Sequence, residues 1–519
     1  MNAKRFSTTF SSRAAFTGGW RIGIVLSCLV LAATVSPAQD QQPTPSIVTF
    51  TTLVNFDGTN GVGPGNLIQG PDGNIYGTTG GTRGNGTFFK MTPGGSLTES
   101  VRYTGSTPGI SFLGTDGNFY GTGGGGAFAN GAVFRITLDG TLTTLYSFCA
   151  LPNCADGGSP FGITLGRDGN FYGTTGLGGT GTGCGIGGCG TAFQLTPAGK
   201  LATIHNFCSQ PACADGYLNF GGLIQAGDGN FYGITNSGGI TTTGCGSVGC
   251  GTIFKLTAKG VFTTIYSFCP TTSGGVCLDG ARPTAGVEQG ADGALYGTAQ
   301  FGGANCASMG GCGVAFQVTT AGAYTTLYSF CTQASCADGA NPSTSLTEGD
   351  DGNLYGTTLD GGTGICSFSV YEPGCGTVFQ LSPGGTLTTL HQFLGSDGTS
   401  ANTVLQDTNG SFYGTTYTGG ATSTHCFNGC GTVFRVSTGL KPFVVLLTKS
   451  GKVGATVQIL GTNLTGSTAV SFNGVAATFT VVSATEIHAT VPAGATSGFV
   501  RVTTANRTLK SNERFQVRQ

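Results

Sequence analysis

The chain has 519 residues, of which 96 are glycine and only 9% are charged, and its formal net charge is −1. The glycines lack the every-third spacing of collagen, and 38% hydrophobic with 10% aromatic residues exclude a disordered tail. Without a concentrated basic surface, nucleic acid is not an expected partner.

Residues 1–38 have the pattern of an export signal. Four basic residues precede an apolar run at residues 22–35, and Ser36-Pro37-Ala38 offers small residues at a cleavage site. A membrane anchor is the alternative, but the run is shorter than the roughly 20 residues that a span needs. We therefore expect a cleaved signal, a linker at residues 39–47, secretion or display at the cell surface, and no membrane span in the mature chain.

A phrase of the form Asp-Gly-Asn-aromatic-Tyr-Gly recurs, with small variations, seven times along the chain. Its tyrosines are Tyr76, Tyr120, Tyr172, Tyr232, Tyr296, Tyr355 and Tyr413. Each repeat contains four short segments with the alternation of β-strands, which in the third repeat are residues 161–165, 170–174, 190–196 and 201–207. The Asp-Gly and Pro-Gly links between them suit tight hairpins. This pattern predicts an all-β protein with a seven-bladed β-propeller at residues 48–440; a parallel β-helix is the main structural alternative.

The two ends of the repeat region complement each other. Residues 48–56 match the fourth strand of the other repeats, whereas the last repeat stops after its third strand at residues 431–437. We expect the N-terminal strand to complete the last sheet and cover its edge. Phenylalanines at matched positions of the third and fourth strands are expected to form the core between sheets. His205 and His391 stand where other repeats have tyrosine, so we expect structural roles for both.

Cys28 lies in the signal, and the other 18 cysteines form nine pairs of near neighbours along the chain. In an exported protein such spacing predicts local disulfides; zinc sites are the alternative, although we expect no metal or cofactor. The expected pairs are Cys149 with Cys154, Cys184 with Cys189, Cys208 with Cys213, Cys245 with Cys250, Cys269 with Cys277, Cys306 with Cys312, Cys331 with Cys336, Cys366 with Cys375, and Cys426 with Cys430. All lie before a third strand or after a fourth one, which places them on one face of the propeller. Variable, rigid loops on such a scaffold suit recognition; simple stabilisation of glycine-rich loops is the alternative.

Two stretches resemble known families. The phrases Gly-aromatic-Tyr-Gly-Thr-Thr and Gly-Thr-Val-Phe, between residues 48 and 437, resemble the GloVer tandem-repeat family, which implies a bacterial surface or secreted protein. Residues 441–519 lack cysteine, and their segments 454–464, 470–477, 487–492 and 498–502 resemble an IPT/TIG domain. That resemblance implies an immunoglobulin-like β-sandwich that acts as a spacer or interaction module.

Charge separates these two regions. Residues 39–440 contain 10 basic and 21 acidic residues, a net −11, whereas residues 441–519 contain 8 and 2, a net +6. The basic module is therefore expected to dock on an acidic partner, such as an anionic envelope polymer, or on its own propeller.

Two sets of residues are candidates for ligand binding. One set lies three residues before the Asp-Gly turns, near the predicted central channel, where a solvated channel lining is the alternative: Gln69, Gln225, Gln289, Glu348 and Gln406. The other set lies in long loops and suits carbohydrate or peptide contacts: Asp360, Tyr371, Glu372 and His425.

The sequence contains no catalytic signature that would assign a reaction. No Gly-x-Ser-x-Gly elbow or zincin motif appears. We therefore favour a monomeric, non-catalytic protein that binds an extracellular polysaccharide or surface protein through its disulfide-bearing loops. The alternative is an extracellular propeller enzyme, a lyase or a glycoside-active protein, with Asp360 and Glu372 as its carboxyl pair. A purely structural surface protein is a third possibility.

Overall fold

The computed structural model describes residues 48–82, 85–184, 187–242, 244–305, 311–366 and 373–518. Residues Ser46–Gln519 form one compact unit, which is described here. It is all-β apart from short 3₁₀ turns at η1 (Pro152–Cys154), η2 (Pro211–Cys213), η3 (Gly246–Val248) and η4 (Ala334–Cys336). Within these ranges, no helix is long and apolar enough to cross a membrane.

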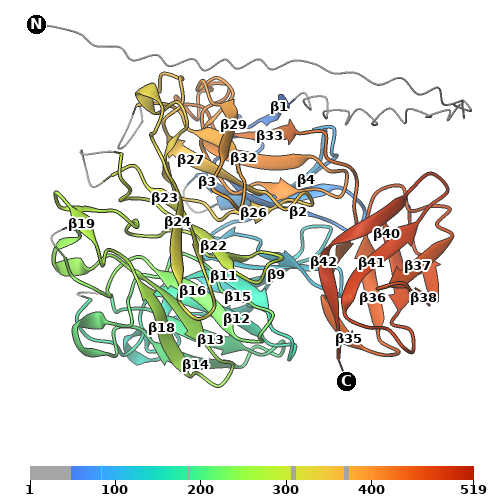
Figure 1. Ribbon diagram of the computed structural model, residues 1–519, viewed down its shortest axis with the longest axis horizontal. Coiled ribbons are helices and arrows are strands. Elements are labelled where there is room, and N and C mark those ends of the chain that lie inside the picture. Colours follow the sequence, from blue (N-terminus) through green and yellow to red (C-terminus); the bar gives the residue numbers. More distant parts are fainter. Residues whose placement is uncertain are drawn as a thin grey trace, which may run out of the picture. The chain divides into compact units, whose positions relative to one another are not determined.

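Each repeat forms one antiparallel sheet of four strands in sequence order (Figure 1). The sheets of the first, third, fourth and fifth repeats contain β2 (Pro64–Gln69), β3 (Ile75–Thr82), β4 (Asn85–Met91) and β5 (Leu97–Arg102); β11 (Gly158–Leu165), β12 (Phe171–Leu177), β13 (Thr191–Leu195) and β14 (Leu201–Asn206); β15 (Ile224–Gln225), β16 (Phe231–Thr235), β17 (Thr252–Leu256) and β18 (Phe262–Ser267); and β21 (Glu288–Gln289), β22 (Leu295–Ala299), β23 (Val314–Val318) and β24 (Tyr324–Ser329). A small hairpin, β19 (Thr272–Ser273) with β20 (Val276–Cys277), lies between the sheets of the fourth and fifth repeats in sequence.

In the other three repeats the first strand is split into two pieces. These sheets contain β6 (Thr107–Pro108), β7 (Phe112–Leu113), β8 (Phe119–Gly124), β9 (Ala132–Ile136) and β10 (Leu142–Ser147); β25 (Ala340–Pro342), β26 (Thr347–Glu348), β27 (Leu354–Asp360), β28 (Thr377–Leu381) and β29 (Leu387–Gln392); and β30 (Thr399–Ala401), β31 (Leu405–Gln406), β32 (Phe412–Thr418) and β33 (Thr432–Ser437). The seventh sheet is completed by β1 (Thr49–Asn55), which pairs antiparallel with β33. The expected closure by the N-terminal strand is confirmed.

The recurring phrase of the repeats is a hydrogen-bonded turn. In the first repeat, the Asp72 carboxylate accepts hydrogen bonds from the Tyr76 hydroxyl and the Asn74 amide, both at 2.8 Å, while Gly73 takes a φ of +76° that side chains disfavour. The glycine after the tyrosine is required for a different reason, which is the lack of space for a side chain. A Cβ on Gly77 would lie 2.3 Å from the Phe89 ring, so the phrase leaves room for the third-strand phenylalanine.

Those phenylalanines join consecutive sheets. The fourth-strand aromatic of one repeat packs edge-on against the third-strand phenylalanine of the next, with ring centroids 5.0–5.4 Å apart: Phe148 with Phe193, Phe207 with Phe254, Phe268 with Phe316, Phe330 with Phe379, and Phe393 with Phe434. Phe56, which follows β1, makes the same contact with Phe89 of the first repeat, at 5.4 Å. The contact therefore also links the seventh sheet to the first.

The C-terminal region is a sandwich of two sheets around its own core. One sheet contains β34 (Val445–Leu446), β36 (Thr456–Leu460), β40 (Glu486–Thr490) and β39 (Phe479–Val481), and the other contains β35 (Ser450–Lys452), β42 (Thr508–Arg518), β41 (Gly498–Thr503), β37 (Ala469–Phe472) and β38 (Val475–Ala477). Val457, Ile459, Phe472 and Val500 are fully buried or nearly so between them. The sandwich contacts Asp-Gly turns of the repeats, where Gln458 and Thr485 donate to the Thr115 and Pro71 carbonyls at 2.9 and 2.6 Å.

Candidate functional site

The two ends of the repeat sheets differ in their loops. Because the four strands run antiparallel in sequence order, the Asp-Gly and Pro-Gly turns lie at one end. The second-to-third and fourth-to-first connections lie at the other end. We call this the disulfide end, because its loops carry all eight disulfides of the described residues. These are Cys149–Cys154, Cys184–Cys189, Cys208–Cys213, Cys245–Cys250, Cys269–Cys277, Cys331–Cys336, Cys366–Cys375 and Cys426–Cys430. The expected partner of Cys312, Cys306, lies outside the described residues.

Some of these disulfides lie close together. The sulfur atoms of Cys245, Cys250, Cys269 and Cys277 are all within 4.8 Å of one another. They form two disulfides, whereas a metal ligand must be a thiolate. In the oxidised protein this cluster therefore holds two adjacent loops rigid.

A buried or half-buried aspartate anchors each of five fourth-to-first loops. Its carboxylate bonds to a fourth-strand ring: Asp156 to Tyr146, Asp279 to Tyr266, Asp338 to Tyr328, Asp215 to His205 and Asp397 to His391, at 2.6–3.1 Å. Both histidines thus make the aspartate contact that tyrosine makes in the other repeats, as expected for a structural role. Asp215 also accepts hydrogen bonds from the backbone N–H groups of Ser209 and Gln210. The loops that border the disulfide end are consequently fixed by both covalent and polar contacts.

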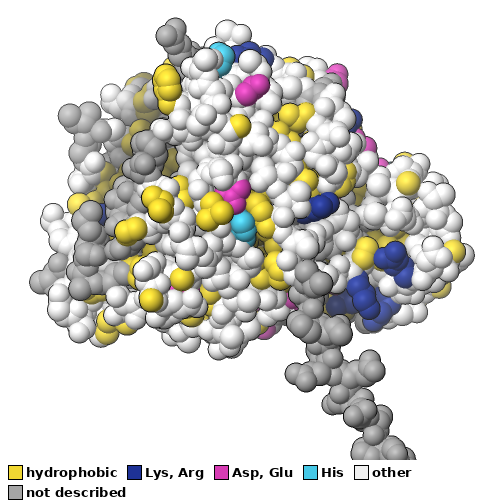
Figure 2. Space-filling view, turned by 90° about the horizontal axis from the view of Figure 1, so that it is seen from above, with side chains coloured by type: hydrophobic (Ala, Val, Ile, Leu, Met, Phe, Trp, Pro, Cys, Tyr) yellow, Lys and Arg dark blue, Asp and Glu magenta, His cyan; other side chains and the backbone are white. Residues whose placement is uncertain are grey.

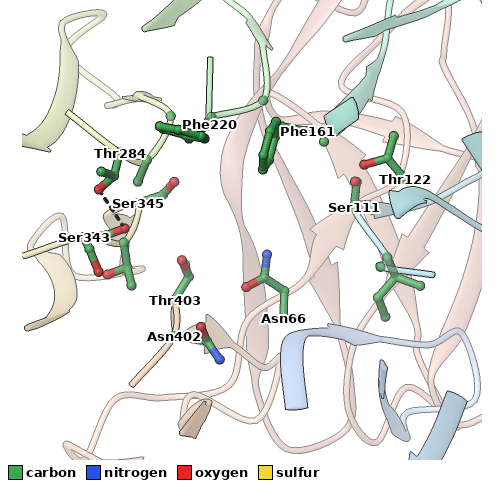
Figure 3. Close-up of a pocket in the computed structure, with 18 residues that line it drawn as sticks. Asn66, Ser111, Thr122, Phe161, Phe220, Thr284, Ser343, Ser345, Asn402 and Thr403 are labelled. Atoms are coloured by element: carbon green, nitrogen blue, oxygen red, sulfur yellow. Dashed lines mark hydrogen bonds between the residues drawn. The ribbon is translucent and has the colours of Figure 1, made fainter. Parts of the chain in front are cut away.

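A cavity of about 350 Å³ lies where the first strands of all seven repeats converge. Its polar side chains are Asn66, Ser111, Thr122, Thr284, Ser343, Thr344, Ser345, Asn402 and Thr403, and two phenylalanines, Phe161 and Phe220, complete its side-chain wall with Ile110 and Ala285. Figure 3 shows the two aromatic rings on one side of the cavity and the amides of Asn66 and Asn402 on the other. Among the residues that the structure describes, no charged side chain lines it.

The two aromatic rings are held against each other. Phe161 and Phe220 pack edge to face at 5.4 Å between centroids, and the Phe220 side chain is 39% exposed. An exposed apolar ring beside hydroxyl and amide groups offers one surface for C–H groups and another for hydrogen bonds.

A second cavity of about 570 Å³ continues from the first. The two share Gly109, Thr122, Phe161, Gly162 and Asn402 in their linings. The second extends over the loops of neighbouring repeats to Tyr417, whose side chain is 59% exposed. The described residues that line it are uncharged as well. Together they form an uncharged channel, defined here as these two cavities.

Of the long-loop candidates, Asp360 and His425 do not line the uncharged channel. Asp360 is buried on β27, and His425 is exposed in the loop between β32 and β33. Tyr371 and Glu372 lie outside the described residues.

The five candidates near the Asp-Gly turns connect adjacent sheets instead. Each side-chain oxygen accepts a hydrogen bond from a backbone N–H of the preceding repeat, two residues after the matched position there: Gln225 from Arg167, Gln289 from Gly227, Glu348 from Ala291, Gln406 from Asp350, and Gln69 from Thr408, at 2.7–3.1 Å. The last of these again joins the first repeat to the seventh. The spacing along the sequence does not predict this role.

The residues of the channel were missed by the sequence argument. They precede the turn-proximal set by about three or four positions on the first strands, in segments of small and neutral polar residues such as Thr284-Ala285-Gly286 and Ser343-Thr344-Ser345. A comparison of the repeats at that position, where charge is absent in all seven, is the signal that would have located them.

Glu288, beside this set on β21, provides a pH-dependent prediction. Burial raises its pKa to about 7; the Lys449 charge opposes the rise, and the Glu513 and Glu348 charges add to it. A carboxyl with a raised folded-state pKa makes the folded state lose stability as pH rises from about 4.3, its unfolded value, to about 7. Glu288→Gln should therefore be more stable than the parent above about pH 7, and the difference should vanish below about pH 4. Urea midpoints across this range measure it; an equal difference at both ends would contradict the prediction.

Three solved structures resemble this chain at low sequence identity. A fungal alcohol oxidase of the AA5 family, in complex with copper, is 12% identical with a TM-score of 0.48 and covers 91% of this chain and 99% of its own. A luciferin-regenerating enzyme is 11% identical with a TM-score of 0.38, at 76% and 97% coverage. PorZ, a surface component of the type-IX secretion system of Porphyromonas gingivalis, is 15% identical with a TM-score of 0.44, at 90% and 61% coverage. No function is taken from these likenesses, since each TM-score is below 0.5.

The search of curated proteins gave no match. Family models did match, over both regions that the sequence distinguishes, and the eight disulfides fit an extracellular β-rich protein. The chain carries the Gloeobacter/Verrucomicrobia repeat over residues 42–245 and an IPT/TIG domain over residues 442–517.

Proposed function

We propose that this chain is an extracellular, non-catalytic binding protein that takes an uncharged carbohydrate in the channel at its disulfide end. Residues 1–38 are its export signal, residues 39–47 a linker, residues 48–440 a seven-bladed β-propeller and residues 441–519 the IPT/TIG domain. Two contacts support a closed ring, that of Phe56 with Phe89 and that of Gln69 with Thr408. They join the seventh sheet to the first in the same way as the matching contacts join other consecutive sheets.

The single observation that carries the binding proposal is the neutral polar and aromatic lining that the described residues give to both cavities. A neutral saccharide offers many hydroxyl groups and apolar ring faces, and it needs hydrogen-bond partners and aromatic surfaces rather than ions. Asn66, Ser111 and Asn402 supply the first, and Phe161, Phe220 and Tyr417 the second. The combined volume lies in the range of small-molecule sites.

The proposal is supported further by rigidity. Sites whose loops are already ordered lose little conformational entropy on binding. The disulfides and the buried aspartates fix the connections that border the channel, so the protein does not need to reorganise around a ligand.

Phe161→Ala is the test with the most direct readout. We expect the full chain to bind a neutral oligosaccharide on a glycan array, and Phe161→Ala to weaken that binding by about tenfold, equivalent to about 1.4 kcal/mol. Phe427→Ala is the matched control, since this aromatic is 86% exposed in a disulfide loop and lines neither cavity. Binding unchanged in Phe161→Ala, binding lost equally in both variants, or no neutral glycan bound at all would contradict the proposal.

A further inference from the structure

The outer face of the β41–β42 hairpin carries one aromatic ring among three cationic side chains. Arg501 is the cross-strand partner of Lys510, and Phe499 that of Arg514. The Lys510 ammonium lies 4.2 Å from the Phe499 ring centroid and the Arg514 guanidinium 5.5 Å from it. Arg501 and Arg514 are exposed, and Phe499 is half-buried. We call these four residues the cationic-aromatic patch.

The patch is not explained by stability. Like charges in directly opposed cross-strand positions are destabilising, yet Arg501 faces Lys510. In the described part of the chain, no ion pair involves Arg501, Lys510 or Arg514. Both acids of the domain lie in other contacts: Glu513 contacts Lys449 at 2.5 Å, and Glu486 contacts His488 at 2.7 Å.

One carboxylate of the repeats acts on the patch. Burial raises the pKa of Asp350, and the Lys510 charge opposes that rise. Asp350 is therefore within electrostatic reach of Lys510. Figure 2 shows Lys and Arg side chains gathered on the C-terminal domain, whereas charged side chains are few and scattered on the rest of the visible face.

We propose that the cationic-aromatic patch binds an anionic polysaccharide. Carboxylate or sulfate groups of the polymer pair with Arg501 and Arg514, whose planar guanidinium groups match such anions. The flexible Lys510 side chain turns from the ring to a third anion and frees Phe499 to pack against the apolar face of a sugar. The chemistry is the opposite of that of the channel, which has no charged side chain, so the two sites take different polymers or different segments of one envelope.

The choice of polysaccharide over nucleic acid rests on place and charge. Eight disulfides fit an extracellular protein. Uronate and sulfate polymers are available outside the cell. Only residues 441–519 are basic, at 8 basic to 2 acidic, against 10 to 21 in residues 39–440. A nucleic-acid site would have to work against that acidic neighbour over a longer contact.

The test uses the full chain and two probes, polygalacturonate for carboxylate and heparin for sulfate, in binding assays at about 50 mM salt. We expect Arg501→Gln combined with Arg514→Gln to weaken binding to at least one probe by about tenfold or more, and high salt to weaken the unsubstituted protein similarly. Phe499→Ala should weaken it less, by a few fold. The matched control is Lys200→Gln combined with Lys259→Gln, which removes two exposed charges from turns of the repeats and should leave binding unchanged.

Three results would overturn the inference. They are the absence of binding to both probes, an equal loss in the control, and tighter binding of a short duplex DNA that depends on the same two arginines. Circular dichroism of each variant separates loss of binding from loss of folding. Phe161→Ala should leave binding to the anionic probes intact, so failure here is distinguishable from failure of the proposal for the channel.

Discussion

A chain that lacks residues 48–56 is expected to be less stable than the parent by at least about 3 kcal/mol. Strand β1 pairs with β33 from Thr49 to Asn55, and its loss leaves the ladder groups of β33 open at an edge that can pair with other chains. Val54 and Phe56 are 6% and 0% exposed, and burial of such side chains contributes about 1.5–3 kcal/mol each. Urea unfolding followed by circular dichroism measures the change.

The matched control for this deletion is a chain that begins at Val48, which retains β1. It should unfold at the same urea concentration as the longer chain. A synthetic peptide of residues 48–56 should restore part of the lost stability, since added strands bind open sheet edges through main-chain hydrogen bonds. If the deletion and its control unfold together, the N-terminal strand does not close the last sheet in solution.

Asp215→Ala is expected to destabilise the protein by about 3 kcal/mol or more. The carboxylate is fully buried and accepts hydrogen bonds from the His205 ring, the Ser209 hydroxyl and two backbone N–H groups, at 2.8–3.2 Å. Removing it leaves several partly buried donors without their acceptor, at a cost of about 1–3 kcal/mol for each donor that water does not reach. Asp139→Ala, in an exposed turn, is the control and should cost less than about 1 kcal/mol.

The same substitution has a defined pH dependence. Burial acts to raise the pKa of Asp215, but hydrogen bonds from His205, Ser209 and Gln210 outweigh it, and the pKa is lowered. The contribution of this carboxylate is therefore present above its unfolded pKa of about 3.9 and is lost as pH falls through the lower folded value. The difference between Asp215→Ala and the parent should shrink below about pH 4; a difference that grows in acid would contradict the assignment.

Much of the fold follows from local chemistry and could be predicted. The turn of Asp72, Gly73 and Asn74 closes within a few residues, and the strands on each side alternate along the same short stretch. The closure by β1 was also predictable, because a missing fourth strand at one end and a spare one at the other are visible in the repeat count. The phenylalanine contacts followed from matched positions, since equal places in equal units meet equal neighbours.

The candidate site was predicted less well, for a physical reason. Gln225 and Gln406 were selected as polar residues at a shared position, but whether an amide binds a ligand or a neighbouring backbone depends on the distance between two sheets. That distance depends on the packing of whole repeats. Asp360 looked like an accessible loop carboxylate, yet β27 extends through it and buries it.

By itself, the sequence determined the seven four-stranded units, the completing strand, the local pairing of the cysteines and the change to a basic C-terminal domain. Each of these depends on residues close together in the chain or on a count of repeats. Only the tertiary structure decided that Asn66, Phe161 and Asn402, which lie far apart in sequence, line one uncharged cavity. It also decided that Lys510 and Arg514 lie beside a single ring and that Arg501 lies opposite Lys510. Such groupings depend on sheet packing and strand register, which bring together side chains whose spacing in the sequence carries no common period.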